Sequence, residues 1–321
     1  MTWSERVVVR DGVRLSCRDW RGNGSGGGAG PRHGHGGGAG HRRGGGAGDG
    51  NRRGGGAGDG SGDESGPAVV LLHGLAGHAG EWDPLAARLQ ADGHRVVAVD
   101  QRGHGASERR PEDTSRAAYV ADTLAVLDQL DVAQPLLVGQ SLGGHTAMLT
   151  AAAHPGRLLG LVLVEAGPGG PNPGVTEEIG GWLASWPVPF PTRDAAVRFL
   201  GGGPVGEGWA DGLERRERDG GGWWPRFDPD VMVRSLAENA TRAFWSEWEA
   251  VDCPTLAVVA QNGIIEPAQF DGMVRRRPGL RAASVPGTGH DLHLERPDAL
   301  HHVLTDFLGE LRTCHGVHSN S

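Results

Sequence analysis

The chain has 321 residues, of which 57 are glycine and 37% are hydrophobic, and its formal net charge is −8. Globular proteins average about 7% glycine and about 45–50% apolar residues. Much of the excess glycine lies in residues 22–66, and the rest has an ordinary composition, which excludes a fibrous or wholly disordered protein. The acidic net charge disfavours nucleic acid as a partner. The three cysteines are far apart and predict neither a disulfide framework nor a zinc site.

A β-hairpin is predicted at the start of the chain. Val7–Arg10 and Val13–Trp20 alternate in polarity on either side of an Asp11-Gly12 turn, and an Asp-Gly pair in this setting favours a hairpin. The glycine-rich residues 22–66 follow. They lack the apolar side chains that would offset conformational entropy, so we expect this insert to be disordered. It has no aromatic side chain on which a base could stack, which disfavours RNA binding.

From residue 67 onward, short apolar runs alternate with stretches of helix length. Continuous apolar strands separated by helices are typical of a parallel sheet that is covered on both faces. The sequence therefore predicts an α/β fold with a mostly parallel sheet and helices on both faces. The predicted strands are Ala68–Leu72, Arg95–Val99, Pro135–Val138, Leu158–Val164 and Thr255–Val259, and the predicted helices are Trp82–Asp92, Ser115–Leu130, Leu142–Ala153 and Pro297–Leu311.

Residues 167–248 interrupt this alternation. They are rich in glycine and proline and hold seven of the ten tryptophans, so we interpret them as an inserted helical lid. Trp182, Trp186 and Phe190 form an aromatic patch that we expect to line an apolar substrate cavity. The alternative is that these side chains form the small core of the lid itself.

The segment Gly139-Gln140-Ser141-Leu142-Gly143 directly follows a predicted strand and opens a predicted helix. Gly-x-Ser-x-Gly in this context indicates a nucleophile elbow, in which a strained turn exposes the serine hydroxyl above the sheet. We expect Ser141 to be the nucleophile. The loop at His73-Gly74-Leu75 is predicted to contribute the N–H of Leu75, which would form an oxyanion hole with the N–H of Leu142. We expect His73 to be a buried residue that holds this loop.

A second loop supplies the candidate general base. Gly287-Thr288-Gly289-His290 follows the apolar run Ala282–Val285, and a histidine at the end of a strand can reach a nucleophile at the same edge of a parallel sheet. We therefore expect His290 to act as the base. We expect His293, His301 and His302 to be surface residues. The block Asp100–Ser107 is interpreted as a structural turn.

These motifs resemble the α/β-hydrolase fold superfamily. The resemblance covers roughly residues 5–20 and 67–312 and rests on His73-Gly74, Asp100–Ser107, the Gly139–Gly143 elbow and Gly289-His290 with Glu295-Arg296-Pro297, which occur in the order of the family. It implies a serine–acid–histidine triad, with Ser141 as nucleophile and His290 as base.

The triad acid is where the sequence departs from the family. The family usually places an aspartate after the penultimate strand, and aligning the loop 260–267 puts Gly263 at that position. Some members carry the acid one strand after the nucleophile strand, and that strand here ends in Glu165. We expect Glu165 to be the acid because a carboxylate there would lie near the same edge of the sheet. Glu266, another carboxylate and a site without an acid remain open.

These patterns predict a serine hydrolase that cleaves an ester, lactone or thioester of a mostly apolar small molecule through an acyl-enzyme on Ser141, with no metal and no cofactor. The alternatives are a non-hydrolytic lyase, cyclase or cofactor-free oxygenase on the same fold, or a ligand-binding member with an idle triad. No secretory signal or membrane-spanning run is recognised, so a cytoplasmic protein is expected. The predicted parts are a core of residues 1–21, 67–166 and 249–312, the insert 22–66, the lid 167–248 and a flexible tail 313–321.

Overall fold

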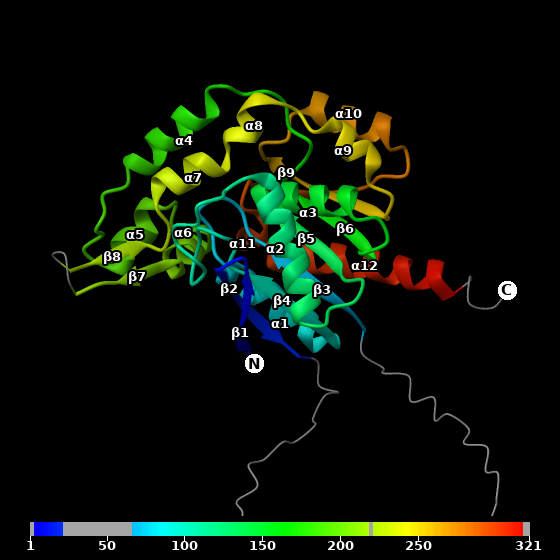
Figure 1. Cartoon of the computed structure of the whole chain (residues 1–321), viewed down its shortest axis with the longest axis horizontal. Coiled ribbons are helices and arrows are strands. Elements are labelled where there is room, and N and C mark those ends of the chain that lie inside the picture. The colour runs from blue at the N-terminus through cyan, green and yellow to red at the C-terminus, as the bar shows by residue number, and fades with distance from the viewer. Residues whose placement is uncertain (1–2, 22–65, 218–220, 317–321) are drawn as a thin grey trace, which may run out of the picture.

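A computed structural model describes residues 3–21, 66–217 and 221–316 (Figure 1). The predicted disorder of the glycine-rich insert therefore concerns residues that lie outside the described ranges, apart from Gly66. The final helix continues to Gly316, past the predicted start of a flexible tail at residue 313. Within the described ranges, no helix combines the length and apolarity that crossing a membrane requires.

A mostly parallel sheet of eight strands forms the centre of the fold, as the sequence predicts. Only the hairpin strands β1 and β2 run antiparallel to their neighbours. The order across the sheet is β1-β2-β4-β3-β5-β6-β9-β10. Its strands are β1 (Ser4–Arg10), β2 (Val13–Trp20), β3 (Gly66–Leu72), β4 (His94–Val99), β5 (Leu136–Gln140), β6 (Gly160–Val164), β9 (Thr255–Asn262) and β10 (Arg281–Gly289).

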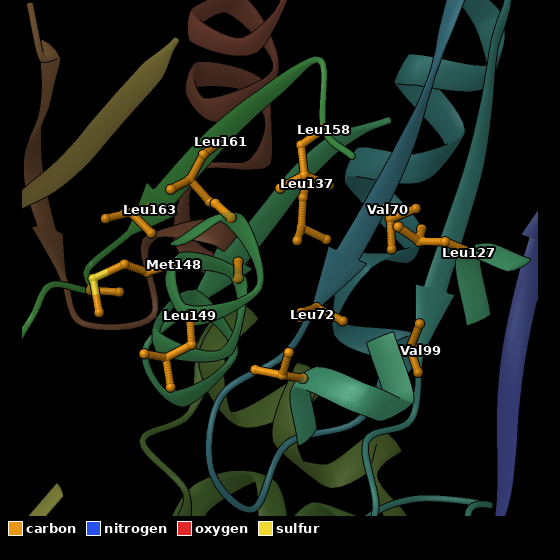
Figure 2. Packing of buried hydrophobic residues seen from close by; sticks show 14 of the residues in the cluster. Val70, Leu72, Val99, Leu127, Leu137, Met148, Leu149, Leu158, Leu161 and Leu163 are labelled. Atoms are coloured by element: carbon orange, nitrogen blue, oxygen red, sulfur yellow. The ribbon is translucent and has the colours of Figure 1, made fainter. Parts of the chain in front are cut away.

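Helices cover both faces of this sheet, and alternating side chains of each strand serve the two faces. Along β3, Val70 and Leu72 pack on one face, and Val69 and Leu71 pack on the other. Figure 2 shows the first layer, in which Val70 and Leu72 lie with strand residues and with Met148 of α3. Helices α2 (Arg116–Gln129), α3 (Leu142–Ala153), α9 (Trp245–Ala250) and α10 (Pro267–Arg276) contribute to this face, and α1 (Asp83–Ala91) and α12 (Pro297–Gly316) cover the opposite one.

The segment of residues 167–248, here called the inserted segment, leaves the sheet after β6 and returns before β9. Most of its elements arch over one end of the sheet in Figure 1. A separate apolar cluster holds it together and includes Leu183, Phe227 and Val231. Its elements are α4 (Val175–Ala184), α5 (Arg193–Phe199), α6 (Gly203–Asp211), β7 (Leu213–Arg215), β8 (Trp223–Pro225), α7 (Pro229–Ser235), α8 (Ala237–Thr241) and the start of α9.

The residues on either side of residues 22–65 lie close together. Trp20 of β2 pairs with Val96, and Gly66 of β3 is in register with His94 on the other side of β4. One strand therefore separates the two ends, which corresponds to about 10 Å.

Replacing residues 22–65 with a linker of about five residues is expected to leave the fold intact, since about five extended residues span more than 10 Å. The shorter loop costs less closure entropy, so the free energy of unfolding should stay constant or rise by about 1–2 kcal/mol. Urea unfolding of the shortened and full-length proteins measures this difference. An insoluble product, or one less stable by more than about 1 kcal/mol, contradicts the prediction.

Candidate active site

Four loops at the carboxyl edge of the sheet carry the side chains that the sequence analysis selected. His73 follows β3, Ser141 follows β5, Glu165 follows β6 and His290 follows β10. The carboxyl ends of parallel strands meet at one edge of a sheet. Ser141, Glu165 and His290 accordingly line one cavity.

Ser141 occupies a strained turn between β5 and α3, with a φ of 51° and a ψ of −118°. The flanking glycines make this turn possible. A Cβ at Gly139 would lie 2.3 Å from the carbonyl oxygen of Gly143, and a Cβ at Gly143 would lie 2.4 Å from that of His73. No side chain tolerates such contacts. The turn presents Ser141 to the cavity at the N-terminus of α3, where the helix dipole favours negative charge.

Two buried histidines fix the loop after β3. His73 Nε2 accepts a hydrogen bond from Gln101 N–H at 3.0 Å, and His73 Nδ1 lies 2.7 Å from the carbonyl oxygen of Gly74. His104 Nε2 accepts from Ala76 N–H at 3.1 Å. These bonds confirm the loop-holding role predicted for His73. Burial lowers the pKa of His73 to about 4 and that of His104 to about 3, so both rings are neutral near pH 7.

Leu75 and Leu142, the residues expected to form an oxyanion hole, lie on two different elements of the chain. Leu75 follows the fixed His73 loop, and Leu142 is the first residue of α3. Both line the same cavity as Ser141. The backbone N–H groups in the first turn of a helix have no partner within that helix. The amide of Leu142 is therefore available to an anion.

Glu165 and His290 face each other in the cavity that Ser141 also lines. Glu165 Oε2 lies 3.6 Å from His290 Nδ1, and the Glu165 side chain is fully buried whereas that of His290 is 32% exposed. The carboxylate accepts hydrogen bonds from Ala260 N–H at 2.6 Å and Ile264 N–H at 2.7 Å, whereas His290 Nδ1 lies just beyond hydrogen-bonding distance of it. These bonds hold the carboxylate oxygens in fixed positions, one of them toward the imidazole.

Glu165 occupies the space in which the family's aspartate would begin. A Cβ at Gly263 would lie 2.0 Å from Glu165 Oε2, and its three nearest atoms would all belong to that carboxyl group. The other candidate acid, Glu266, is exposed at the start of α10 and does not line the cavity. Of the two glutamates that the sequence leaves open, only Glu165 is close to His290.

Gln140 is a site residue that the sequence analysis did not select. Its amide Nε2 donates to the carbonyl oxygen of His290 at 3.1 Å and lies 3.2 Å from His290 Nε2. An amide nitrogen is only a donor, so the ring nitrogen beside it is the acceptor and the ring proton is on Nδ1, toward Glu165. The position directly before Ser141 in the elbow was the only available signal for this residue.

The cavity has a volume of about 500 Å³. Its walls come from the carboxyl edge of the sheet, the inserted segment and the loop after β9. The lining is mostly apolar. It includes Leu75, Leu142, Val175, Ile179, Trp182, Trp209, Leu236, Ile264 and Ile265.

The predicted aromatic patch is divided by the structure. Trp182 lines the cavity, as expected, whereas Trp186 and Phe190 do not. Both are buried in the apolar cluster of the inserted segment, where their ring centroids are 6.2 Å apart. The assignment of Trp186 and Phe190 to the substrate site is therefore wrong, because packing within the segment covers both rings. Trp209, which was not among the residues selected for the patch, lines the cavity.

His293 was predicted to be a surface residue, and this prediction is also wrong. Its side chain is buried, with Nε2 3.3 Å from Glu81 Oε2 and its ring 4.7 Å from that of Trp82. A buried carboxylate partner offsets part of the cost of burying an imidazole. That partner, Glu81, is far from His293 in the sequence, so the local pattern around His293 does not reveal it. Among the described residues, no group of three or more His, Cys, Asp or Glu side chains is arranged to hold a metal ion.

The block Asp100–Ser107 is a structural turn, as predicted. Asp100 accepts hydrogen bonds from Ala79 N–H at 2.6 Å and Ala106 N–H at 2.9 Å. Arg102 is buried and forms an ion pair with Asp122 at 2.6 Å. These carboxylates are used in holding loops together and do not line the cavity.

Comparison with known proteins gives consistent matches. Residues 69–303 match the alpha/beta hydrolase family. The sn-1-specific diacylglycerol lipase ABHD11 of Mus musculus is 31% identical over 258 residues, which cover 77% of this chain and 82% of the relative. Esterase YbfF of Escherichia coli (strain K12) is 28% identical over 75% of this chain and 93% of its own. A crystal structure of E-2-(acetamidomethylene)succinate hydrolase shares the fold, with a TM-score of 0.75 at 20% identity and coverage of 96% and 99%.

The two loop-holding histidines are expected to make the fold sensitive to acid. Their folded-state pKa values, about 4 for His73 and about 3 for His104, lie below the ordinary 6.5, so the unfolded chain binds more protons as the pH falls below 6.5. Their stabilising effect is complete above pH 6.5 and is lost as the pH falls toward 4, at up to about 1.4 kcal/mol per pH unit for each ring. Urea unfolding at pH 7, 6 and 5 measures the slope. His104→Gln should make it shallower, and an unchanged slope in that variant contradicts the assignment.

Proposed function

Since the chain belongs to the alpha/beta hydrolase family, as its match over residues 69–303 shows, we propose that it is a serine hydrolase that cleaves an ester, lactone or thioester of a mostly apolar small molecule. The observation that carries this proposal is the position of Ser141 on a strained elbow, beside the Glu165–His290 pair, at the wall of one apolar cavity. The names of the lipase and the esterase among its relatives agree with this chemistry.

The proposed reaction has two halves. Ser141 Oγ attacks the carbonyl carbon while His290 Nε2 accepts its proton, and the oxyanion is held by the N–H groups of Leu75 and Leu142. The tetrahedral intermediate collapses when His290 returns the proton to the leaving oxygen or sulfur, which leaves an acyl group on Ser141. Water then attacks the acyl-enzyme with His290 as the base, and the acid product leaves.

Glu165 is proposed as the group that orients this histidine and stabilises its positive charge. Its fixed carboxylate faces Nδ1, so it favours the tautomer with the free Nε2 and stabilises the imidazolium formed during attack. Gln140 holds the same tautomer from the other side, through the carbonyl oxygen and Nε2 of His290. Transfer of the serine proton to Nε2 requires that the Gln140 amide move away from that nitrogen.

The inserted segment is proposed to act as a lid over the site. Residues of α4, including Ile179 and Trp182, and Leu236 before α8 supply apolar cavity walls. A water-poor cavity strengthens the hydrogen bonds to the developing oxyanion. The same walls favour an apolar acyl or alkyl arm in the substrate.

Ser141→Ala is expected to abolish ester hydrolysis without unfolding the protein, because alanine removes only the attacking oxygen. Turnover of p-nitrophenyl butyrate should fall by a factor on the order of 10⁴ or more. A fluorophosphonate should label the wild-type protein once, at Ser141, and should not label the variant. Turnover that survives in Ser141→Ala would show that another group is the nucleophile.

The position of the acid is tested by moving it between loops. Glu165→Ala is expected to reduce kcat/KM by a factor on the order of 10³–10⁴. In Glu165→Ala/Gly263→Asp, the new Cβ enters the space that the Glu165 carboxylate has left, so part of the activity should return. Gly263→Asp alone should be less stable than the wild type, because its Cβ would overlap the Glu165 carboxyl group and a second negative charge would lie beside the first.

The exposed Glu266 provides the matched control. Glu266→Ala should retain the kcat/KM of the wild type, because its side chain does not line the cavity. Wild-type activity in Glu165→Ala would remove Glu165 from the mechanism, and a loss in Glu266→Ala would point to the other glutamate.

A further inference from the structure

The cavity lining carries hydrogen-bonding groups that the proposed reaction does not use. His145, Asn239 and Gln269 line the cavity together with the apolar residues. Both ring nitrogens of His145 are buried without a hydrogen-bond partner among the described residues, and so is Asn239 Oδ1. Burying such groups unpaired lowers stability, so their persistence at a cavity wall points to a ligand.

His145 is fixed close to the nucleophile. It lies in the first turns of α3, where its backbone N–H donates to the carbonyl oxygen of Ser141 at 3.0 Å. The edge-to-face contact of its ring with Phe244, at 4.4 Å between centroids, holds the imidazole plane. Residues four apart at the start of a helix lie about 5–6 Å from each other. A group bound by His145 would therefore lie only a few bonds from the carbonyl that Ser141 attacks.

The contrast with the loop-holding histidines separates His145 from a structural residue. Both ring nitrogens of His73 have partners, and so do both of His104. His145 is also buried, at 4% exposure for the residue, yet neither ring nitrogen is paired in the described structure. A histidine that served packing alone could be an apolar ring of the same size.

The charge state of His145, Asn239 and Gln269 restricts what they can bind. Burial, with the nearby cations Arg116 and Arg242, lowers the pKa of His145 well below its usual value, so the ring is neutral. A neutral imidazole offers one N–H donor and one acceptor, and the Asn239 and Gln269 amides are uncharged as well. A hydroxyl or carbonyl group matches these partners without the cost of desolvating a charge.

We propose that His145 and Asn239 form a polar subsite that hydrogen-bonds an uncharged hydroxyl or carbonyl group on one arm of the ester, a few bonds from the scissile carbonyl. The inference rests on the proposed function, since it names the substrate class of the same cavity. The substrate is then an ester with an apolar arm interrupted by one neutral polar group, rather than a plain hydrocarbon ester.

Two pairs of esters test the subsite. The first pair is p-nitrophenyl hexanoate and the same ester with a ketone one carbon from the end of its acyl chain. The second pair is hexyl butyrate and the same ester with a ketone on its hexyl arm. The wild-type protein should prefer the ketone by at least about tenfold in kcat/KM in one pair, since a substrate without it leaves a buried donor unpaired. The two pairs show which arm reaches His145.

His145→Phe should bring that ratio to about one, because it removes both nitrogens and keeps a ring of similar size. The melting temperature of this variant should be equal to or higher than that of the wild type, because removing the two ring nitrogens breaks no hydrogen bond. His145→Gln should recover part of the preference. His154→Phe, at the end of α3 and outside the cavity, is the matched control and should keep the full ratio.

Asn239→Leu provides a second route if His145→Phe does not fold, and it should also lower the ratio. A wild-type ratio near one in both pairs, or an unchanged ratio in both His145→Phe and Asn239→Leu, would overturn the subsite while leaving the hydrolase proposal in place. No turnover of any of the four esters would overturn both.

Discussion

The close approach of α3 to the ends of β3 and β5 is the constraint on which the site depends. It requires backbone contact at Gly139 and Gly143, where a Cβ would overlap carbonyl atoms. The contact forces Ser141 into a left-handed conformation, and it places the N-terminus of α3 beside the loop that holds Leu75. The proposed nucleophile and the candidate oxyanion donors are thus positioned by one packing contact, and the buried His73 and His104 hold the neighbouring loop by hydrogen bonds.

The placement of Glu165 follows from the order of the strands. Since β6 lies between β5 and β9, a side chain at its end can reach both the histidine loop and the loop after β9. The carboxylate does so through hydrogen bonds to the N–H groups of Ala260 and Ile264. Gly263 leaves the space for it. An acid from β6 and a side chain at position 263 exclude each other sterically, so the glycine and the glutamate are parts of one arrangement.

The sequence predicted the sheet and the elbow because their signals are local. Continuous apolar runs mark buried parallel strands, and glycines at fixed offsets mark the turn. The burial of Trp186, Phe190 and His293 is set by partners far away in the chain, as the contact of His293 with Glu81 shows, and local patterns do not contain it. Helix α10 was missed for another reason, since it is short and mostly exposed, only Gly272 and Met273 are buried in it, and few apolar residues mark it in the sequence.

Departures from local rules collect around the cavity. Six non-glycine residues in the described ranges have positive φ, and three of them, Ala76, Ser141 and Glu165, belong to the loops of the site. His145, whose ring nitrogens are unpaired in the described structure, lines the same cavity. Each feature costs stability that the packed sheet offsets, and strain of this kind persists where surrounding structure over-determines it. The turn at Ser141 and the bend at Glu165 fit the proposed triad, and the buried unpaired ring of His145 fits the proposed subsite, in which a substrate completes its hydrogen bonds.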